Sequence, residues 1–278
     1  QQEGLLLCHY CGYREPVPEH CPECGSAALK RYGLGTERLE KELRQLFPQA
    51  RVARLDRDTA THPNKALKIL TAFKNQELDI LIGTQMITKG HDLPRVTLVG
   101  VVAADLGLYF PEYHAGERTF QLLAQVAGRA GRGEQPGQVF IQTFHPRHPA
   151  IAAVHTQSYE EFYQQELASR RDLGYPPFTR LALLRLSGQE AIKVEKAAQA
   201  LRRHLHQVSQ QRGLTGQIRL LGPAPAPLAR LRGEYRWQLL IKSSGRQPLA
   251  TLLAEAETWG GRQSRLSLFL DVDPASLL

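Results

Sequence analysis

The chain has 278 residues, of which 42% are hydrophobic and 22% charged, a balance that excludes a disordered polypeptide and allows one to three domains. No apolar run reaches the ~18 residues needed to cross a bilayer, and no signal-peptide pattern is present, so we expect a cytoplasmic protein without membrane segments. The net charge of +8 is placed unevenly, because residues 172–278 hold 15 Lys/Arg against 8 Asp/Glu while residues 1–171 hold 20 against 19. The last third therefore indicates a polyanionic partner, with a generally basic, solvated surface as the alternative. Since the chain does not open with methionine, we also expect a piece of a longer protein.

All four cysteines lie near the start of the chain, in two C-x2-C pairs that are each followed directly by glycine. The pairs are Cys8 with Cys11 and Cys21 with Cys24. Four thiolates at this spacing fit a tetrahedral structural Zn²⁺, and so short a segment needs the metal for most of its stability. Reduced, unligated cysteines are the alternative, and the adjacent His9 and His20 are weaker candidate ligands. We therefore predict a partial zinc-binding segment over residues 1–33.

Residues 34–150 alternate between helical and strand patterns. Apolar periodicity predicts helices over 37–47, 66–75 and 120–127, and strands over 51–55, 79–84, 96–103 and 137–144. Thr36 is the expected N-cap of the first helix. This alternation indicates an α/β domain with a parallel sheet, whose functional edge lies at the carboxyl ends of the strands. We expect Thr84, Asp92, Asp105 and the arginine stretch that follows to gather at this edge.

The stretch from Gln125 to Arg132 is the strongest candidate for chemistry. Arg129 and Arg132 are three residues apart, as on one helical face, and Gln125 stands one turn ahead. Guanidinium groups suit a transferring γ-phosphoryl group, although a helix end with solvated arginines is the alternative. The 278 residues contain no G-x-x-x-x-G-K-[ST] loop and no Asp-Glu dipeptide. We therefore expect this domain to be one half of a two-lobed motor.

Residues 151–173 are predicted to form a linker helix, and the Pro-rich turn at 175–178 marks the next boundary. Residues 174–278 then follow the order β-α-β-β-α-β, which predicts an α+β ferredoxin-like domain. A loop over 228–237 combines arginines with aromatic rings, a mixture suited to phosphate contact and base stacking. Its candidate DNA-binding residues are Arg230, Arg232, Tyr235, Arg236 and Trp237. A solvated hairpin with core aromatics is the alternative.

The order of these motifs resembles one known family. The two C-x2-C pairs are followed by GLGTE, LDRDT, ILIGTQMITKGHDLP, PEYHAGERTFQLLAQVAGRAGR, YPPF and LDVDP. The series is similar to the second half of the PriA family, the superfamily 2 DNA helicases of bacterial replication restart, from about Cys8 to Pro274. The resemblance implies a RecA-like second helicase lobe between a zinc module and a C-terminal DNA-binding domain. It also implies an ATP-dependent 3′→5′ DNA helicase that recognises stalled or recombination-derived forks and initiates primosome assembly.

The resemblance assigns roles by motif match. It places Arg129 and Arg132 at the phosphates of ATP and Gln125 near the γ-phosphate. It also places Gly90 and Asp92 near the nucleotide. ATP and Mg²⁺ would be held mainly by a lobe that these residues do not include.

The implied partners are DNA forks and single strands, single-stranded DNA-binding protein and primosome components, with Thr84 near the DNA backbone. The family's zinc module resembles eight cysteines that serve two Zn²⁺, of which four are present here. Whether the two cysteine pairs share one ion is therefore left open. The alternative function is a non-catalytic zinc- and DNA-binding module.

Overall fold

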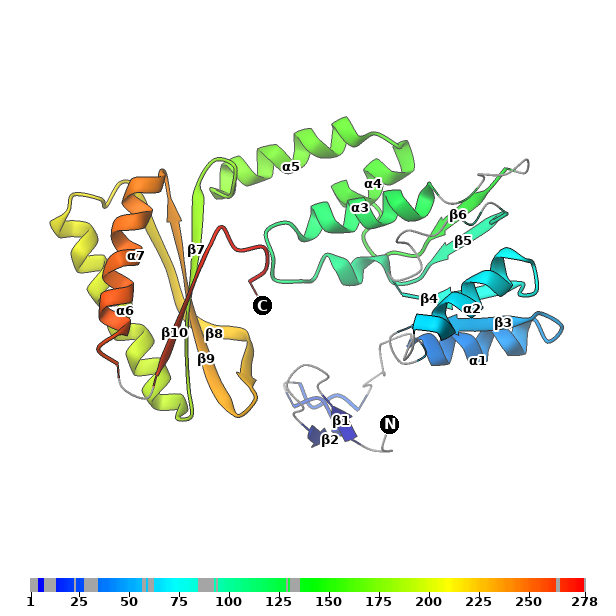
Figure 1. Cartoon of the computed structure of the whole chain (residues 1–278), viewed down its shortest axis with the longest axis horizontal. Coiled ribbons are helices and arrows are strands. Elements are labelled where there is room, and N and C mark those ends of the chain that lie inside the picture. Colours follow the sequence, from blue (N-terminus) through cyan, green and yellow to red (C-terminus); the bar gives the residue numbers. More distant parts are fainter. Residues whose placement is uncertain are drawn as a thin grey trace. The chain divides into compact units, whose positions relative to one another are not determined.

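The structure is a computed structural model of the whole chain, shown in Figure 1. It describes residues 5–7, 14–22, 24–27, 35–56, 59, 63–84, 93, 95–128, 130, 136–263 and 266–277. The chain divides into two compact units. One unit holds residues 1–29, 111–113 and 167–278, and the other holds residues 30–110 and 114–166.

The second of these units begins with a helix–strand–helix–strand segment. Helix α1 (Thr36–Leu46), strand β3 (Val52–Leu55), helix α2 (Pro63–Lys74) and strand β4 (Ile80–Gly83) follow in order. Strand β3 lies between the two helices and pairs with β4 in parallel (Figure 1). The expected N-cap was wrong, since Gly35 takes that position without a side-chain cap bond. Thr36 is instead the first helical residue, and its hydroxyl donates a hydrogen bond to Asp56.

The same unit continues with a second parallel pair. Strand β5 (Leu98–Val101) and strand β6 (Gln138–Ile141) flank the 3-10 helix η2 (Ala104–Gly107) and helix α3 (Ala115–Ala127). Helix α4 (Pro149–Thr156) packs on α3, and helix α5 (Tyr159–Leu173) follows. The core centres on Leu123 and on Phe120, whose ring stacks on that of Phe162 at 4.5 Å between centroids. Two helices, α4 and α5, therefore occupy the segment that was expected to be one linker helix.

The predicted parallel α/β arrangement is confirmed, because helices alternate with strands and both strand pairs are parallel. Within the described residues, however, the strands form two separate two-stranded sheets rather than the one continuous sheet expected. Apolar periodicity identifies which residues are extended, but the choice of neighbouring strand depends on contacts between distant segments.

The C-terminal part of the other unit is a four-stranded antiparallel sheet covered by two helices. It consists of β7 (Arg180–Gly188), α6 (Ala191–Gln211), β8 (Ile218–Leu231), β9 (Glu234–Ser243), α7 (Arg246–Gly260) and β10 (Ser267–Val272). The strand order across the sheet is β10-β7-β9-β8. Helices α6 and α7 lie side by side on one face (Figure 1). The predicted β-α-β-β-α-β order is therefore present.

The core of this domain lies between that sheet face and the helices. Leu184, Leu201, Leu239 and Leu252 are fully buried within it. Burying one such leucine contributes about 1.5–3 kcal/mol, so this cluster supplies much of the stability of the domain.

The β8–β9 hairpin differs from the expectation of a short strand followed by a Pro-rich stretch and a loop. Strand β8 runs unbroken through the prolines to Leu231, and a two-residue turn leads into β9. Both turn residues have positive φ, 51° at Arg232 and 88° at Gly233, the geometry of a type I′ turn. The prolines are tolerated because β8 is the edge strand and carries register shifts beside them.

A stack of rings and cations joins residues 111–113 to this unit. The ring of Tyr113 stacks on Tyr175 with 5.3 Å between centroids and 10° between planes. Arg170 lies over the outer face of Tyr113 at 5.3 Å, and Nζ of Lys242 lies 3.4 Å from the Tyr175 centroid. Cation–π contacts and ring stacking thus hold residues 111–113 in this unit, although the residues before and after them in the sequence belong to the other unit.

The unit also contains a short antiparallel ladder near the N-terminus, formed by β1 (Leu5–Leu7) and β2 (Arg14–Pro16). None of the helices in the described ranges combines the length and apolar character needed to cross a membrane.

Candidate nucleotide, nucleic-acid and zinc sites

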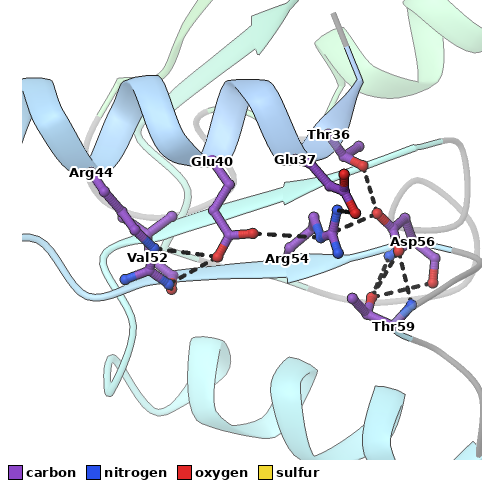
Figure 2. Close-up of polar contacts among 8 residues, drawn as sticks. All are labelled: Thr36, Glu37, Glu40, Arg44, Val52, Arg54, Asp56 and Thr59. Carbon is purple, nitrogen blue, oxygen red and sulfur yellow. Dashed lines mark hydrogen bonds and ion pairs between the residues drawn. The ribbon is translucent and has the colours of Figure 1, made fainter. Parts of the chain in front are cut away.

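A polar network ties the start of α1 to the carboxyl end of β3 (Figure 2). The Asp56 carboxylate accepts hydrogen bonds from the Thr36 hydroxyl at 2.5 Å and from the Thr59 amide at 2.9 Å. Nε of Arg54 lies 3.3 Å from the same carboxylate. Burial opposes ionisation of Asp56, but the bonds from Thr36 and Thr59 and the charge of Arg54 together lower its pKa. Asp56 is therefore a charged residue that holds the backbone after β3.

The Arg54 guanidinium is shared among several carboxylates. It lies 3.2 Å from Glu37 and 3.5 Å from Glu40, both on α1, in addition to Asp56. Glu40 also accepts from Arg44, which donates a second hydrogen bond to the carbonyl of Val52 at 2.6 Å (Figure 2). Three acidic partners around one cation fix α1 against β3.

Asp105 follows strand β5 and bonds to the segment that follows β6, so it lies at the carboxyl ends of this parallel pair, as expected. Its side chain is buried, and its carboxylate accepts from the Thr143 hydroxyl at 2.6 Å and from the amides of Phe144 and His145 at 3.0 and 3.2 Å. Burial disfavours the charged form, but these bonds prevail and lower the pKa of Asp105. Three protein donors occupy this carboxylate and hold the segment after β6 against η2, which gives Asp105 a structural role.

Replacing Asp105 with asparagine should destabilise this segment. An amide keeps one acceptor oxygen, so at least one buried donor is left without a partner, at about 1–3 kcal/mol. We expect faster hydrogen exchange at the amides of Phe144 and His145 in Asp105→Asn at pH 7. Because the folded pKa is lowered, the contribution of Asp105 is present at neutral pH and is lost as the pH falls below about 4.

Asp79 provides the control for this prediction. Hydrogen bonds from the Arg51 side chain and backbone amide lower the pKa of Asp79 to about 2. Both side chains of this ion pair are, however, about half exposed. Solvent screening makes such pairs weak, so Asp79→Asn should change exchange at residues 144 and 145 little. Equal exchange at these amides in Asp105→Asn and wild type would contradict the structural role assigned to Asp105.

The residues expected around the nucleotide are only partly described. Thr84 is exposed and directly follows the carboxyl end of β4, and Gln125 is exposed in the last turn of α3. Gly90, Asp92, Arg129 and Arg132 lie outside the described residues. Helix α3 ends at Ala127 with Gly128 as its C-cap, so it stops before Arg129, as the glycine favours.

The five candidate DNA-binding residues of the β8–β9 hairpin separate into two groups. Arg230 and Arg232 are exposed near the turn, and Arg230 lies over the Tyr235 ring at 5.1 Å. Tyr235 and Trp237 are half-buried and pack on the core cluster between sheet and helices. Their rings thus serve the core, as the alternative interpretation held, and Arg236 is buried with 8% exposure on the opposite face.

Sequence reasoning missed what surrounds Arg236. Arg185 on β7 is paired directly with Gln238 on β9, and Arg236 is two residues away on the same side of the sheet. Strand alternation was the available signal, because it separates Arg236 and Gln238 from the core residues Trp237 and Leu239.

One of the two cysteine pairs lies in the described part of the chain, and it forms a tight turn. The amide of Gly25 donates to the carbonyl of Cys21 at 2.8 Å, and Gly25 has a φ of 69°. Neither Cys21 nor Cys24 forms a disulfide in the described part of the chain. A C-x2-C pair in such a turn is typical of half of a zinc site. Cys8 and Cys11 lie outside the described residues, within which no group of three potential metal ligands is found.

Comparison with known proteins covers both parts of the chain. A family model for the helicase conserved C-terminal domain matches residues 32–134, and one for the primosomal protein N C-terminal domain matches residues 171–275. The Replication restart protein PriA of Bacillus subtilis is 44% identical over 98% of the chain, and that of Synechocystis is 46% identical over 99%. The chain belongs to the PriA family. It spans about a third of the length of these relatives, 34% and 32% respectively.

The match to the PriA family also holds for Haemophilus influenzae, whose protein of the same name is 40% identical over the whole chain. The helicase match includes α1 to α3 and the arginine stretch, and the primosomal match coincides with the sheet of β7 to β10. The chain therefore contains a helicase C-terminal domain followed by a primosomal protein N C-terminal domain.

Proposed function

We propose that this chain supplies the second motor lobe, a zinc-binding segment and a DNA-binding domain to an ATP-dependent 3′→5′ DNA helicase. The observation that carries the proposal is the match to replication restart proteins over nearly the entire chain, with the helicase motifs in the expected order. In this proposal, the full-length protein recognises stalled or recombination-derived forks and initiates primosome assembly in the cytoplasm. Its partners are DNA, single-stranded DNA-binding protein and primosome components.

In the proposed mechanism, ATP with Mg²⁺ binds mainly to a first lobe that these residues do not include. Arg129 and Arg132 stabilise charge on the transferring phosphoryl group, and Gln125 lies near the γ-phosphate. Gly90 and Asp92 contact the nucleotide, while Thr84 contacts the DNA backbone. The RecA-like assignment of residues 34–150 is supported by the parallel strand pairs with helices on both sides of β3.

For the C-terminal domain, we propose a ferredoxin-like fold with a DNA-binding role. Its β-α-β-β-α-β order and antiparallel sheet support the fold, and its excess of 15 Lys/Arg over 8 Asp/Glu in residues 172–278 supports an anionic partner. The exposed Arg230 and Arg232 at the hairpin are available for phosphate contact.

The isolated chain should not hydrolyse ATP, because its 278 residues contain neither a phosphate-binding loop nor an Asp-Glu pair for Mg²⁺. A coupled phosphate-release assay with and without single-stranded DNA measures this, with the full-length protein as the positive control. Turnover by the chain alone that DNA stimulates would contradict the division of labour between two lobes. In isolation, the chain should behave as a zinc- and DNA-binding module.

A further inference from the structure

The face of the C-terminal sheet opposite α6 and α7 carries a line of unusual side chains. Phe269 on β10, Arg185 on β7 and Gln238 on β9 are register partners, so they form one row across three strands. Arg236 lies in the neighbouring row on the same face. The alternate residues of these strands, such as Leu184, Leu239 and Leu268, belong to the core beneath the helices.

Arg236 is the central observation. Its residue exposure is 8%, and its buried Nη1 has no hydrogen-bond partner. The side-chain oxygen of Gln238 is likewise buried without a partner. A buried guanidinium without an acceptor is costly, and burial lowers the pKa of Arg236. Such a group calls for an explanation, and a ligand that supplies the missing acceptor is one.

The charge around Arg236 favours an anion. Burial is the first cause that lowers the pKa of Arg185, and the nearby charge of Arg236 is the second. The Asp271 carboxylate raises this pKa. The site thus brings two guanidinium groups together, with the Asp271 carboxylate nearby. Planar guanidinium forks match the oxygens of a phosphate.

The neighbouring groups indicate which anion fits. Phe269 is 52% exposed, so its ring is accessible beside these charged groups. The Arg185 guanidinium lies 6.0 Å from its ring centroid. An exposed ring beside guanidinium forks is the combination used for single-stranded nucleic acid. The amide oxygen of Gln238 can accept from a base N–H, such as N3–H of thymine.

We propose that this sheet face is a single-stranded DNA site, in which Arg236 and Arg185 bind a backbone phosphate and Phe269 stacks on an adjacent base. The site rests on the proposed DNA-binding role of the C-terminal domain and gives it a location distinct from the exposed arginines of the β8–β9 turn. Gln238 contributes its free oxygen to the base.

The test measures binding of this chain to a fluorescently labelled single-stranded oligothymidylate by anisotropy. Arg236→Met should weaken binding by about 10- to 100-fold, because it removes charge-assisted hydrogen bonds to phosphate. It should also lower the salt slope of log Kd by about 1. The matched control Arg203→Gln removes an exposed arginine from α6, on the other side of the sheet, and should change Kd by less than about 3-fold.

Two further measurements separate a binding role from a structural one. Arg236→Met should unfold at a temperature no lower than wild type, because it removes an uncompensated buried charge. Phe269→Ala replaces an exposed ring, so it should fold normally and still weaken binding by about 5- to 100-fold through lost stacking. If both variants bind with wild-type affinity, the proposed site is wrong. It is also wrong if Arg236→Met unfolds at a lower temperature than wild type and still binds with wild-type affinity, because Arg236 is then only structural.

The outcomes also distinguish this site from the function on which it rests. If the wild-type chain binds the oligonucleotide but both variants do so equally well, only the location on the sheet face fails. If the wild-type chain shows no binding even at low salt, the DNA-binding role of the domain fails with it. Polyglutamate serves as a competitor that has negative charge but no bases. If it competes as strongly as unlabelled oligothymidylate, the site does not bind phosphate and base together.

Discussion

Arg129→Ala in the full-length protein is expected to lower DNA-stimulated ATP hydrolysis by about 10³-fold or more and to abolish unwinding. In the proposed mechanism, the guanidinium meets negative charge that builds on the γ-phosphoryl group in the transition state. Alanine leaves nucleotide affinity less affected than turnover, because the stabilised charge develops mainly during the reaction. Steady-state phosphate release and strand separation of a forked substrate measure the two effects.

Single-stranded DNA affinity should stay within about 3-fold of wild type in Arg129→Ala, since this residue acts on nucleotide. Arg95→Ala is the matched control, because Arg95 is an exposed arginine of the same unit whose side chain contacts Gln76. It should keep hydrolysis near the wild-type rate. Normal hydrolysis by Arg129→Ala together with lost DNA affinity would assign Arg129 to the path of the strand instead.

Cys21→Ser is expected to release zinc from the chain and to unfold the segment that contains it. Wild-type chain purified with zinc should hold about one Zn²⁺, with four thiolates as ligands. Loss of one thiolate from a closed site removes most of the affinity, and in so short a segment the binding free energy is the folding free energy. Atomic absorption gives the metal content, and proteolysis of the N-terminal segment reports its unfolding.

The sheet of β7 to β10 should keep its unfolding temperature in Cys21→Ser, because its core lies between that sheet and its own helices. His20→Ala is the informative control, since it changes a neighbouring exposed side chain that could otherwise act as a ligand. It should retain zinc. Full zinc content in Cys21→Ser, or no zinc in the wild-type chain, would show that the four cysteines do not form the site.

The family and the types of element could be predicted from the sequence alone, because both depend on local patterns. The Gln125–Arg132 stretch, the paired cysteines and the β-α-β-β-α-β order are each contained in short windows or in their succession. The resulting assignment to the PriA family agrees with the comparisons over nearly the whole chain.

Only the tertiary structure decided which polar residues are free to bind. Asp105 was expected at the functional edge of the sheet, and donors nearly forty residues later in the chain, at Thr143 to His145, occupy its carboxylate. Arg236 was predicted as one of five DNA-binding residues in a loop, but it is only 8% exposed in strand β9, on the same side of the sheet as Arg185 and Gln238. Hydrogen-bond partners and burial arise from segments distant in sequence, so periodicity and motif spacing could not reveal them.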